Sequence, residues 1–517
     1  MDSATSSGGD DATSSSSGGG SGSSTGSSSG SSSGSGSGGS SGSGSGGASG
    51  SGSGGDSGGC STGTTMCSGQ CVDTLTDPSH CGNCQTMCDG PCNAGHCSGF
   101  TSLYSGAVWQ ADTRIAVGSN GYVAAVWQGS SDPMSATSVV AASISTDPGS
   151  TWSPVQSIKG PNPSATASLP ALAVDAANNF YLAFETFNTN ESHIYSMKAP
   201  AGTTTFGTLS EVTDPAQVTP GDAGVPLYWP NLPTIAVTQS QEIVVTHALG
   251  EWKTCGSSSW ANTCVANLVA ARSTDGQSWT RSQVTANSDG SGPDGGVPDA
   301  VNWATMCTSA TTGRLWGVYD QFGAATHGLG IVVQYSDDDG ATWSTPTVVM
   351  PPTSTDVSFD SPSCAGNGSD VWVEFEVHGT ASPLATSIWV AHSTDGGQTF
   401  GLPKNVMDPS ASHLGWHATL VRDSSGHLEV EYYGGSTDGD PSAGVYFVQS
   451  KDDGATWGTA TRIRAPITLA DYDGTTWTDA WLGYHIGVTT GAGSLYTTFA
   501  DNSSGVSHVD FAKVALP

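Results

Sequence analysis

One eight-residue motif recurs along the C-terminal four fifths of the chain and constrains the fold more than any other feature. Its pattern is Ser-x-Asp-x-Gly-x-Thr-aromatic. Full copies occupy residues 145–152, 336–343, 393–400 and 450–457, and a copy one residue shorter occupies 273–279. The Asp side chain can accept hydrogen bonds from turn amides, the Gly permits a positive φ, and the aromatic ring supplies local core. Each copy is therefore predicted to be a turn between two antiparallel strands.

Short apolar strands recur at a similar spacing and divide the chain into units. Their central residues lie 57, 63, 71, 58, 56 and 66 residues apart: Ile115, Leu172, Ile235, Met306, Cys364, Leu420 and Ile486. Such a repeat, with four strands in each unit, predicts an all-β propeller of four-stranded antiparallel blades. The seventh unit ends at its third strand, so residues 101–110 are expected to supply its fourth strand and close the ring. This count favours seven blades.

The repeated motif resembles the Asp-box, or BNR repeat, of the sialidase superfamily over residues 101–517. The resemblance implies a sialidase-like β-propeller whose boxes are structural and lie on the face away from the active site. Sialidases have six blades, so six is the alternative to the seven units counted here. The family holds the substrate carboxylate with three arginines, whereas in this chain only Arg114 begins an inner strand. It stands in Arg114-Ile-Ala, where the family has Arg-Ile-Pro.

The same resemblance implies three catalytic candidates. Asp132, in Ser-Ser-Asp-Pro, matches the general-acid region of the family. Tyr484, just ahead of an inner strand, stands where the family has its tyrosine nucleophile, and Glu376 or Glu431 would be the base that activates it. Each residue also has a structural interpretation, because a loop Asp commonly forms a turn and a Tyr at a strand start commonly belongs to the core.

Further candidates for ligand binding come from aligning the strands. The second strands place Trp127, Glu185, Asp320 and Glu376 in one column near the predicted functional face. Aromatic faces beside carboxylates suit sugar rings, although the Trp residues could equally seal the blades. The full ligand-binding set is Arg114, Trp127, Trp416, His417, Trp481 and His485. The carboxylates could also form an acidic rim or a calcium site. No cofactor other than this possible calcium and no dedicated metal site is predicted.

The first 98 residues divide into two parts. Residues 1–59 are almost entirely Ser and Gly and cannot bury enough apolar area to fold, so they are predicted to be a disordered tether. Residues 60–98 contain eight cysteines, Cys60, Cys67, Cys71, Cys81, Cys84, Cys88, Cys92 and Cys97. A segment this small is expected to depend on disulfides, while Cys81-x-x-Cys84 leaves zinc as the alternative. The stretch from Cys71 to Cys84 resembles the Stig1-like module and leaves the connectivity open.

Four more cysteines lie in the propeller segment. Cys307 and Cys364 take nearly equivalent first-strand positions in neighbouring units and are predicted to form a disulfide. Cys255 and Cys264 bracket an insertion in the third unit and are predicted to form another.

Charge and composition limit the function classes. With 13 basic against 45 acidic residues and a formal charge of −32, binding to nucleic acid or an anionic membrane is disfavoured. No apolar stretch is long enough to span a bilayer, and no signal peptide is visible at the start. We therefore expect an extracellular or cell-surface monomer whose partner is a carbohydrate or glycoconjugate. The favoured function is non-catalytic glycan recognition, and the alternative is an extracellular exo-glycosidase of sialidase type using carboxylate acid–base chemistry.

Overall fold

The computed structural model describes most of the chain from residue 100 onward. The described residues there are 100–107, 109–130, 138–188, 191–218, 228–251, 266–285, 300–323, 328–351, 357–379, 386–407, 414–435, 444–464, 485–501 and 507–516. In the cysteine-rich segment they are 60, 64–67, 70–74, 76–77, 92–93 and 96–97. Within these ranges, no helix combines the length and apolarity that crossing a bilayer requires.

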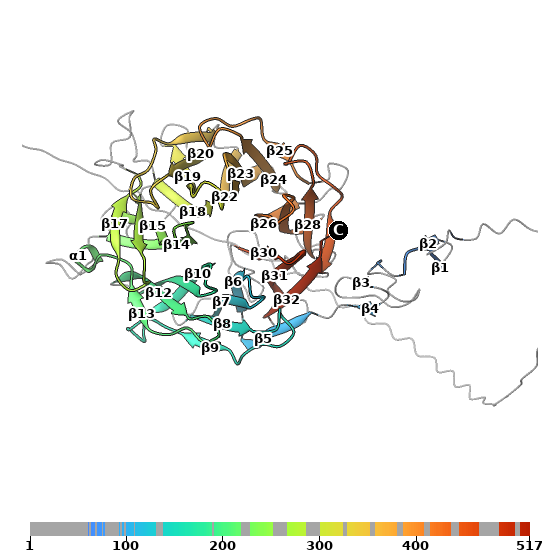
Figure 1. Cartoon of the computed structure of the whole chain (residues 1–517), viewed down its shortest axis with the longest axis horizontal. Helices are drawn as coiled ribbons and strands as arrows, with labels where there is room; N and C mark the ends of the chain where they lie inside the picture. The colour runs from blue at the N-terminus through green and yellow to red at the C-terminus, as the bar shows by residue number, and fades with distance from the viewer. Residues whose placement is uncertain are drawn as a thin grey trace, which may run out of the picture. The chain divides into compact units, whose positions relative to one another are not determined.

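Seven four-stranded antiparallel sheets form a ring, which confirms the predicted propeller and its blade count (Figure 1). Blades one to three contain β6 (Trp109–Val117), β7 (Val123–Ser130), β8 (Val139–Ser145) and β9 (Gln156–Ile158); β10 (Thr166–Val174), β11 (Phe180–Phe187), β12 (Ser192–Ala199) and β13 (Leu209–Glu211); β14 (Tyr228–Val237), β15 (Ile243–Glu251), β16 (Ala266–Ser273) and β17 (Thr280–Gln283). A short helix, α1 (Pro215–Val218), follows the second blade.

Blades four to seven continue the same order from the innermost strand outward. They contain β18 (Ala300–Thr308), β19 (Leu315–Gly323), β20 (Gly328–Ser336) and β21 (Thr347–Met350); β22 (Val357–Asn367), β23 (Asp370–Gly379), β24 (Thr386–Ser393) and β25 (Lys404–Asn405); β26 (Leu414–Arg422), β27 (Leu428–Gly435), β28 (Gly444–Ser450) and β29 (Thr461–Arg464); β30 (Gly487–Gly491), β31 (Ser494–Asp501), β32 (Ser507–Ala515) and β5 (Thr101–Ala107).

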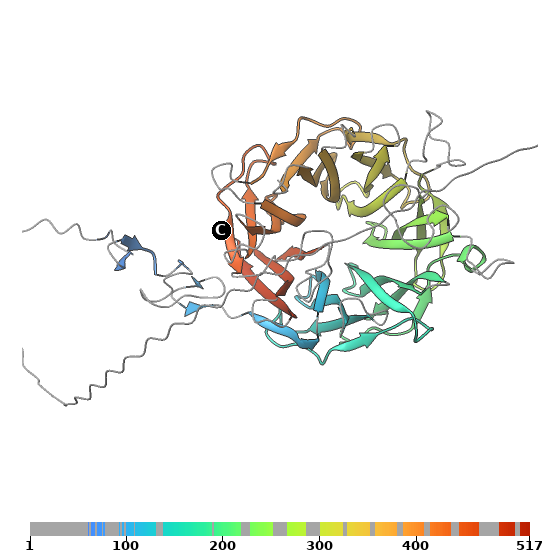
Figure 2. The same cartoon turned by 180° about the vertical axis from the view of Figure 1, so that it is seen from behind.

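The ring is closed by the two ends of the propeller segment. β5 pairs antiparallel with β32, so the predicted closing strand is confirmed (Figures 1 and 2). At the inner side of the same joint, the Thr113 hydroxyl donates to the Thr498 carbonyl at 2.5 Å and accepts from the Gly487 amide at 3.0 Å. A Cβ on Gly487 would lie 2.9 Å from the Arg114 Cα, so the close approach of the two inner strands requires glycine.

The Asp-boxes are hydrogen-bonded turns, as predicted. In the fourth blade, Asp338 Oδ1 accepts from the Ser336 hydroxyl and the Thr342 amide, both at 2.8 Å, and Oδ2 accepts from the Thr342 hydroxyl at 2.6 Å. Gly340 takes φ +84° and donates its amide to Ser336 Oγ at 2.8 Å. These bonds lower the pKa of Asp338 against the opposing effect of burial.

Tryptophans connect boxes to neighbouring blades. Trp316 Nε1, in the fourth blade, donates to the carbonyl of Gly396 in the box of the fifth blade at 2.9 Å. Trp372 Nε1 makes the same bond from the fifth blade to Asp453 in the box of the sixth, also at 2.9 Å. Both indoles are buried in apolar cores that lie between blades. The boxes therefore hold adjacent blades together as well as closing their own turns.

Disulfides occur in both cysteine-containing regions. Cys307 and Cys364 are bonded between the inner strands β18 and β22, which confirms that prediction. The cysteine-rich segment has the two-stranded pairs β1 (Thr65–Cys67) with β2 (Gln70–Val72) and β3 (Cys92–Asn93) with β4 (His96–Cys97). Cys60 is bonded to Cys71, and Cys67 is also in a disulfide. Cys81 and Cys84, on which the zinc alternative was based, lie outside the described residues. Cys255 and Cys264 lie outside the described residues.

We expect Asp338→Asn to lower the midpoint of thermal unfolding by about 1–3 °C, because the amide cannot accept all three box hydrogen bonds. The folded-state pKa of Asp338 is depressed, so its stabilisation is present above pH 4 and is lost as pH falls through the folded pKa. Thermal unfolding at pH 7 and pH 3 measures this. The control is Asp339→Asn, one residue further along the same turn. Equal effects of the two changes at pH 7 would contradict the role of Asp338.

Candidate functional site

Left-handed bulges mark the starts of the inner strands, at the ends away from the boxes. Five described inner-strand residues other than glycine have positive φ at equivalent positions: Asp112 at 51°, Leu169 at 49°, Leu232 at 51°, Ser361 at 50° and His417 at 52°. The pairing register shifts at each of these places. Such backbone is costly for residues with a Cβ and persists where the surroundings impose it. Here it turns successive side chains toward the axis of the ring.

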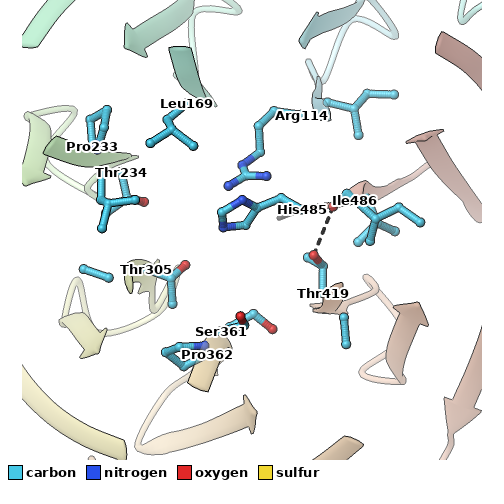
Figure 3. A pocket seen from close by; sticks show the side chains of 16 residues that line it. Arg114, Leu169, Pro233, Thr234, Thr305, Ser361, Pro362, Thr419, His485 and Ile486 are labelled. Atoms are coloured by element: carbon cyan, nitrogen blue, oxygen red, sulfur yellow. Dashed lines mark hydrogen bonds between the residues drawn. The ribbon is translucent and has the colours of Figure 1, made fainter. Parts of the chain in front are cut away.

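An axial pocket of about 110 Å³ lies where these strands converge, and every blade contributes to its lining (Figure 3). The hydroxyl-bearing lining residues are Thr234, Thr305, Ser361, Ser363 and Thr419. The hydroxyl of Ser363 is already engaged, because it donates to Glu374 Oε2 at 2.7 Å and accepts from the Leu420 amide at 2.8 Å. Apolar surface comes from Leu169, Leu232, Pro233, Pro362 and Ile486. The Thr419 hydroxyl donates to the Ile486 carbonyl at 3.0 Å, which joins the inner strands of blades six and seven at the pocket wall.

Among the described lining residues, Arg114 alone has a permanent charge. In the other blades, the strand position equivalent to Arg114 holds a small residue: Ala171, Thr234, Thr305, Ser363, Thr419 and Gly487. This leaves room at the centre for one long side chain. Figure 3 shows the Arg114 guanidinium and the His485 ring side by side near the middle of the pocket.

The two basic side chains differ in charge at neutral pH. Burial lowers the pKa of Arg114 to about 10, opposed by the carboxylate of Asp112, so the guanidinium stays protonated. Burial, and after it the charge of Arg114, lowers the pKa of His485 to about 4. The carboxylate of Asp112 opposes this shift, with Oδ1 3.6 Å from His485 Nδ1. The imidazole is therefore neutral at pH 7. The described part of the lining therefore offers one cation, one neutral imidazole and several hydroxyls.

The predicted column of carboxylates does not line this pocket. Glu376 is fully buried, and its Oε1 accepts from the amide of Ala418 in the next blade at 3.2 Å. Glu185 likewise accepts from the Leu232 amide at 3.3 Å. In the first blade the equivalent residue is Gln128, which accepts from the Leu169 amide at 3.2 Å. These side chains bind the bulged strand of the following blade.

The predicted site residues fall into three groups. Arg114 and His485 line the axial pocket. Trp127, Trp416, His417 and Glu376 are buried outside its lining, with Trp127 donating to Gln110 Oε1 at 2.8 Å and Trp416 inside a core cluster of blades six and seven. Asp132, Trp481 and Tyr484 lie outside the described residues.

Sequence reasoning missed most of the hydroxyl ring. Thr234, Thr305, Ser363 and Thr419 each stand one position before the apolar residue used to mark an inner strand. Aligning the residues before those markers would have found the ring. In the seventh blade the residue equivalent to these markers is Val488, two positions after the assigned Ile486.

No family model and no curated protein matches the chain. Solved structures resemble it in architecture. A protein of unknown function from Dyadobacter fermentans matches with 15% identity and a TM-score of 0.46 over 81% of this chain and 100% of that one. NanB sialidase from Streptococcus pneumoniae matches with 13% identity and a TM-score of 0.44 over 81% and 71%. An α-L-arabinanase from Penicillium chrysogenum matches with 14% identity and a TM-score of 0.44 over 80% and 97%. No residue role is transferred at these similarities.

Glu185→Gln should stabilise the protein at alkaline pH. Burial raises the pKa of Glu185 to about 8, opposed by the Leu232 amide. Its contribution to stability is therefore full below about pH 4 and is lost as pH rises through 8. The amide oxygen of Gln can still accept from the Leu232 amide. Its NH2 group can donate to Ser192, which stands where Ser138 accepts from Gln128 Nε2 at 3.3 Å in the first blade.

We expect the variant to gain at least about 1 kcal/mol of unfolding free energy at pH 9 and to differ little at pH 4. Denaturant unfolding across this range measures the difference. The reciprocal change Gln128→Glu should lose stability as pH rises. Parallel pH curves for wild type and both variants would show that burial does not raise these pKa values.

Proposed function

We propose that this chain is a secreted or surface-tethered propeller that recognises glycans at the axial pocket without cleaving them. The observation that carries the proposal is the pocket chemistry. Arg114, His485 and the hydroxyls of residues such as Thr234 and Thr305 provide donors and acceptors for sugar hydroxyls. The planar guanidinium also suits a carboxylate. Among the described lining residues there is no carboxylate that could serve as acid or base.

The size of the pocket supports recognition of the end of a ligand. Its volume of about 110 Å³ is below the roughly 300–1,000 Å³ of pockets that enclose whole small molecules. A terminal sugar would place one group in the axial pocket and leave the rest of the glycan outside. Because the only permanent charge among the described lining residues is positive, an acidic sugar is the favoured ligand.

Burial of Glu376 supports binding over hydrolysis. Glycoside hydrolysis needs two carboxyl groups placed on either side of the scissile bond. Glu376 is fully buried and engaged with the next blade, so it has no surface for a substrate. Asp132 and Tyr484 stay candidates for the exo-glycosidase alternative.

Arg114→Gln should weaken binding of an acidic glycan about 10–100-fold, because it removes a charge-assisted hydrogen bond. A glycan array identifies the ligand, and calorimetry with that ligand measures affinity. Arg462→Gln is the matched control, since Arg462 lies on the outer strand β29. Equal affinity of wild type and Arg114→Gln would exclude the axial pocket as the site.

Affinity should stay within about twofold between pH 5.5 and pH 8.5, provided that the ligand itself does not titrate there. The reason is that Arg114, with a pKa of about 10, and His485, with a pKa of about 4, keep their charge states across this range. Calorimetry at four pH values measures this. A drop in affinity centred near pH 6.5 would mean that His485 titrates as an ordinary exposed histidine.

A panel of chromogenic glycosides separates binding from catalysis. We expect no turnover, and we expect Glu376→Gln to leave glycan affinity unchanged. Hydrolysis that disappears in Asp132→Asn would instead establish the exo-glycosidase alternative.

A further inference from the structure

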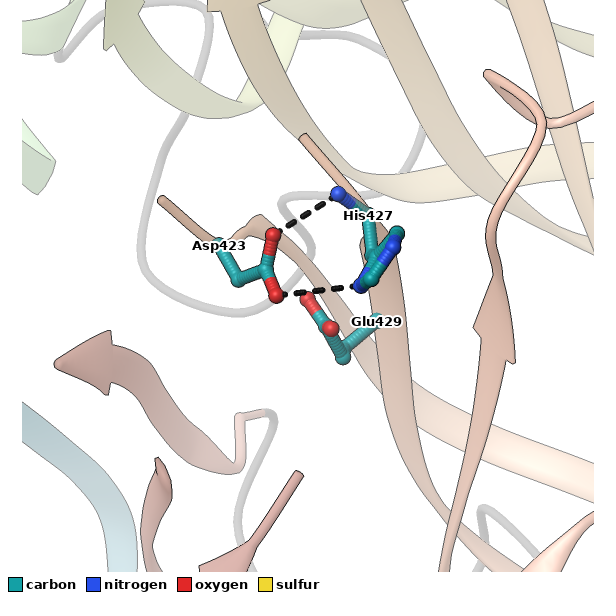
Figure 4. Close-up of side chains that lie close together, drawn as sticks. All are labelled: Asp423, His427 and Glu429. Carbon is teal, nitrogen blue, oxygen red and sulfur yellow. Dashed lines mark hydrogen bonds and ion pairs between the residues drawn. The ribbon is translucent and has the colours of Figure 1, made fainter. Parts of the chain in front are cut away.

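A cluster of two carboxylates and an imidazole lies at the turn between β26 and β27 in the sixth blade (Figure 4). Its members are Asp423, His427 and Glu429. The turn follows the end of β26 that lies away from the bulge at His417, so it is separate from the axial pocket. Neither the proposed glycan site nor the boxes use these residues.

The three side chains converge on one point. One ligand atom from each residue lies within 4.8 Å of the others. Asp423 Oδ2 is 3.2 Å from His427 Nδ1, and Asp423 Oδ1 accepts from the His427 amide at 2.7 Å. The side chain of His427 is 26% exposed while that of Asp423 is 8% exposed, so an ion can reach the cluster from the His427 side.

Glu429 gives the second observation that points to a ligand. Its residue is fully buried, and its Oε1 accepts from Gln449 Nε2 at 3.0 Å. Its Oε2 is buried and has no hydrogen-bond partner among the described residues. In Figure 4 the carboxylate points at Asp423 and His427. A buried carboxylate oxygen facing a second carboxylate is costly unless a proton or a cation lies between them.

The second blade contains the same turn with different chemistry. There Asp175 takes the place of Asp423, and its Oδ1 accepts from the Asn179 amide at 2.7 Å. Its Oδ2 accepts from Asn179 Nδ2 at 2.6 Å and from the Tyr181 hydroxyl at 3.1 Å. The acceptor is thus fully satisfied by donors. In the sixth blade His427 replaces the Asn and Glu429 replaces the Tyr, so an acceptor stands where the turn needs a donor.

We propose that Asp423, His427 and Glu429 bind one divalent transition-metal ion, of which Zn²⁺ fits best. Zn²⁺ takes imidazole nitrogen and carboxylate oxygen at about 2.0–2.2 Å and is commonly held by three protein ligands and water. Ca²⁺ needs 6–8 oxygen ligands, which a set of three with an imidazole does not provide. The ion would join β26 to β27 and keep an open position on the exposed side.

The test uses the full chain with its disulfides intact, freed of metal by chelation and titrated with Zn²⁺ alone at pH 7.5. We expect the wild type to bind one Zn²⁺ per chain at this site. Glu429→Gln should reduce the Zn²⁺ affinity at least about 10-fold, while its amide oxygen still accepts from Gln449. Co²⁺ in place of Zn²⁺ should give visible absorption bands that the variant lacks. Absence of binding to the wild type, or equal binding by the variant, would overturn the proposal.

Two further variants keep the test decisive. The double change His427→Asn with Glu429→Tyr rebuilds the hydrogen-bonded turn of the second blade, so it should fold and lose the ion. His392→Asn is the matched control, because His392 Nε2 lies 2.9 Å from Asp370 Oδ1 and no described residue adds a third ligand there. This variant should bind the ion as the wild type does. Loss of the ion in His392→Asn with retention in the double variant would place the metal elsewhere and contradict the proposal.

Discussion

Closure of the ring is the constraint on which the other features depend. A blade leaves unpaired backbone groups at its edges and buries its apolar faces only against its neighbours. Pairing of β5 with β32 completes the seventh blade, and the apolar cluster around Trp127 and Phe511 then joins blades seven and one. On the other side of the seventh blade, Arg464 Nη2 of the sixth blade forms an ion pair with Asp501 Oδ2 at 2.6 Å. The seventh blade is thus fixed on both sides, and every inner strand is held facing the axis.

The axial pocket follows from this arrangement and from bulges that repeat with it. Three of the bulged strands, β10, β14 and β26, carry an amide that is bound from the preceding blade by Gln128, Glu185 and Glu376 respectively. The carboxylates near the axis are therefore part of the connection between blades. Small residues at the next ring position leave the centre open, and Arg114 enters that space. The positive charge of the pocket therefore comes from the one blade that has a long side chain at a position where the other blades have a small residue.

Repetition also explains how the turns can acquire separate chemistry. The blades share one backbone plan, so the same position can be hydrogen-bonded in one blade and differently composed in another. Asp175 with Asn179 and Tyr181 forms a closed set of donors and acceptors. Asp423 with His427 and Glu429 keeps the turn but replaces donors by ligand atoms. A change of two side chains on an unchanged scaffold is a low-cost way to build a new site.

The sequence by itself determined the features that depend on local hydrogen bonding and on repeat length. The boxes, the seven blades, the closing strand and the pairing of Cys307 with Cys364 all follow from residues at fixed offsets from a motif. Only the tertiary structure decided which side chains face the axis. A bulge shifts the register by a residue, and such a shift moves a side chain to the other face of the strand. For this reason spacing alone did not show that Arg114 faces the pocket. The position of Glu376 between blades was likewise visible only from its bond to the next blade, and Gln128 rather than Trp127 is its equivalent in the first blade.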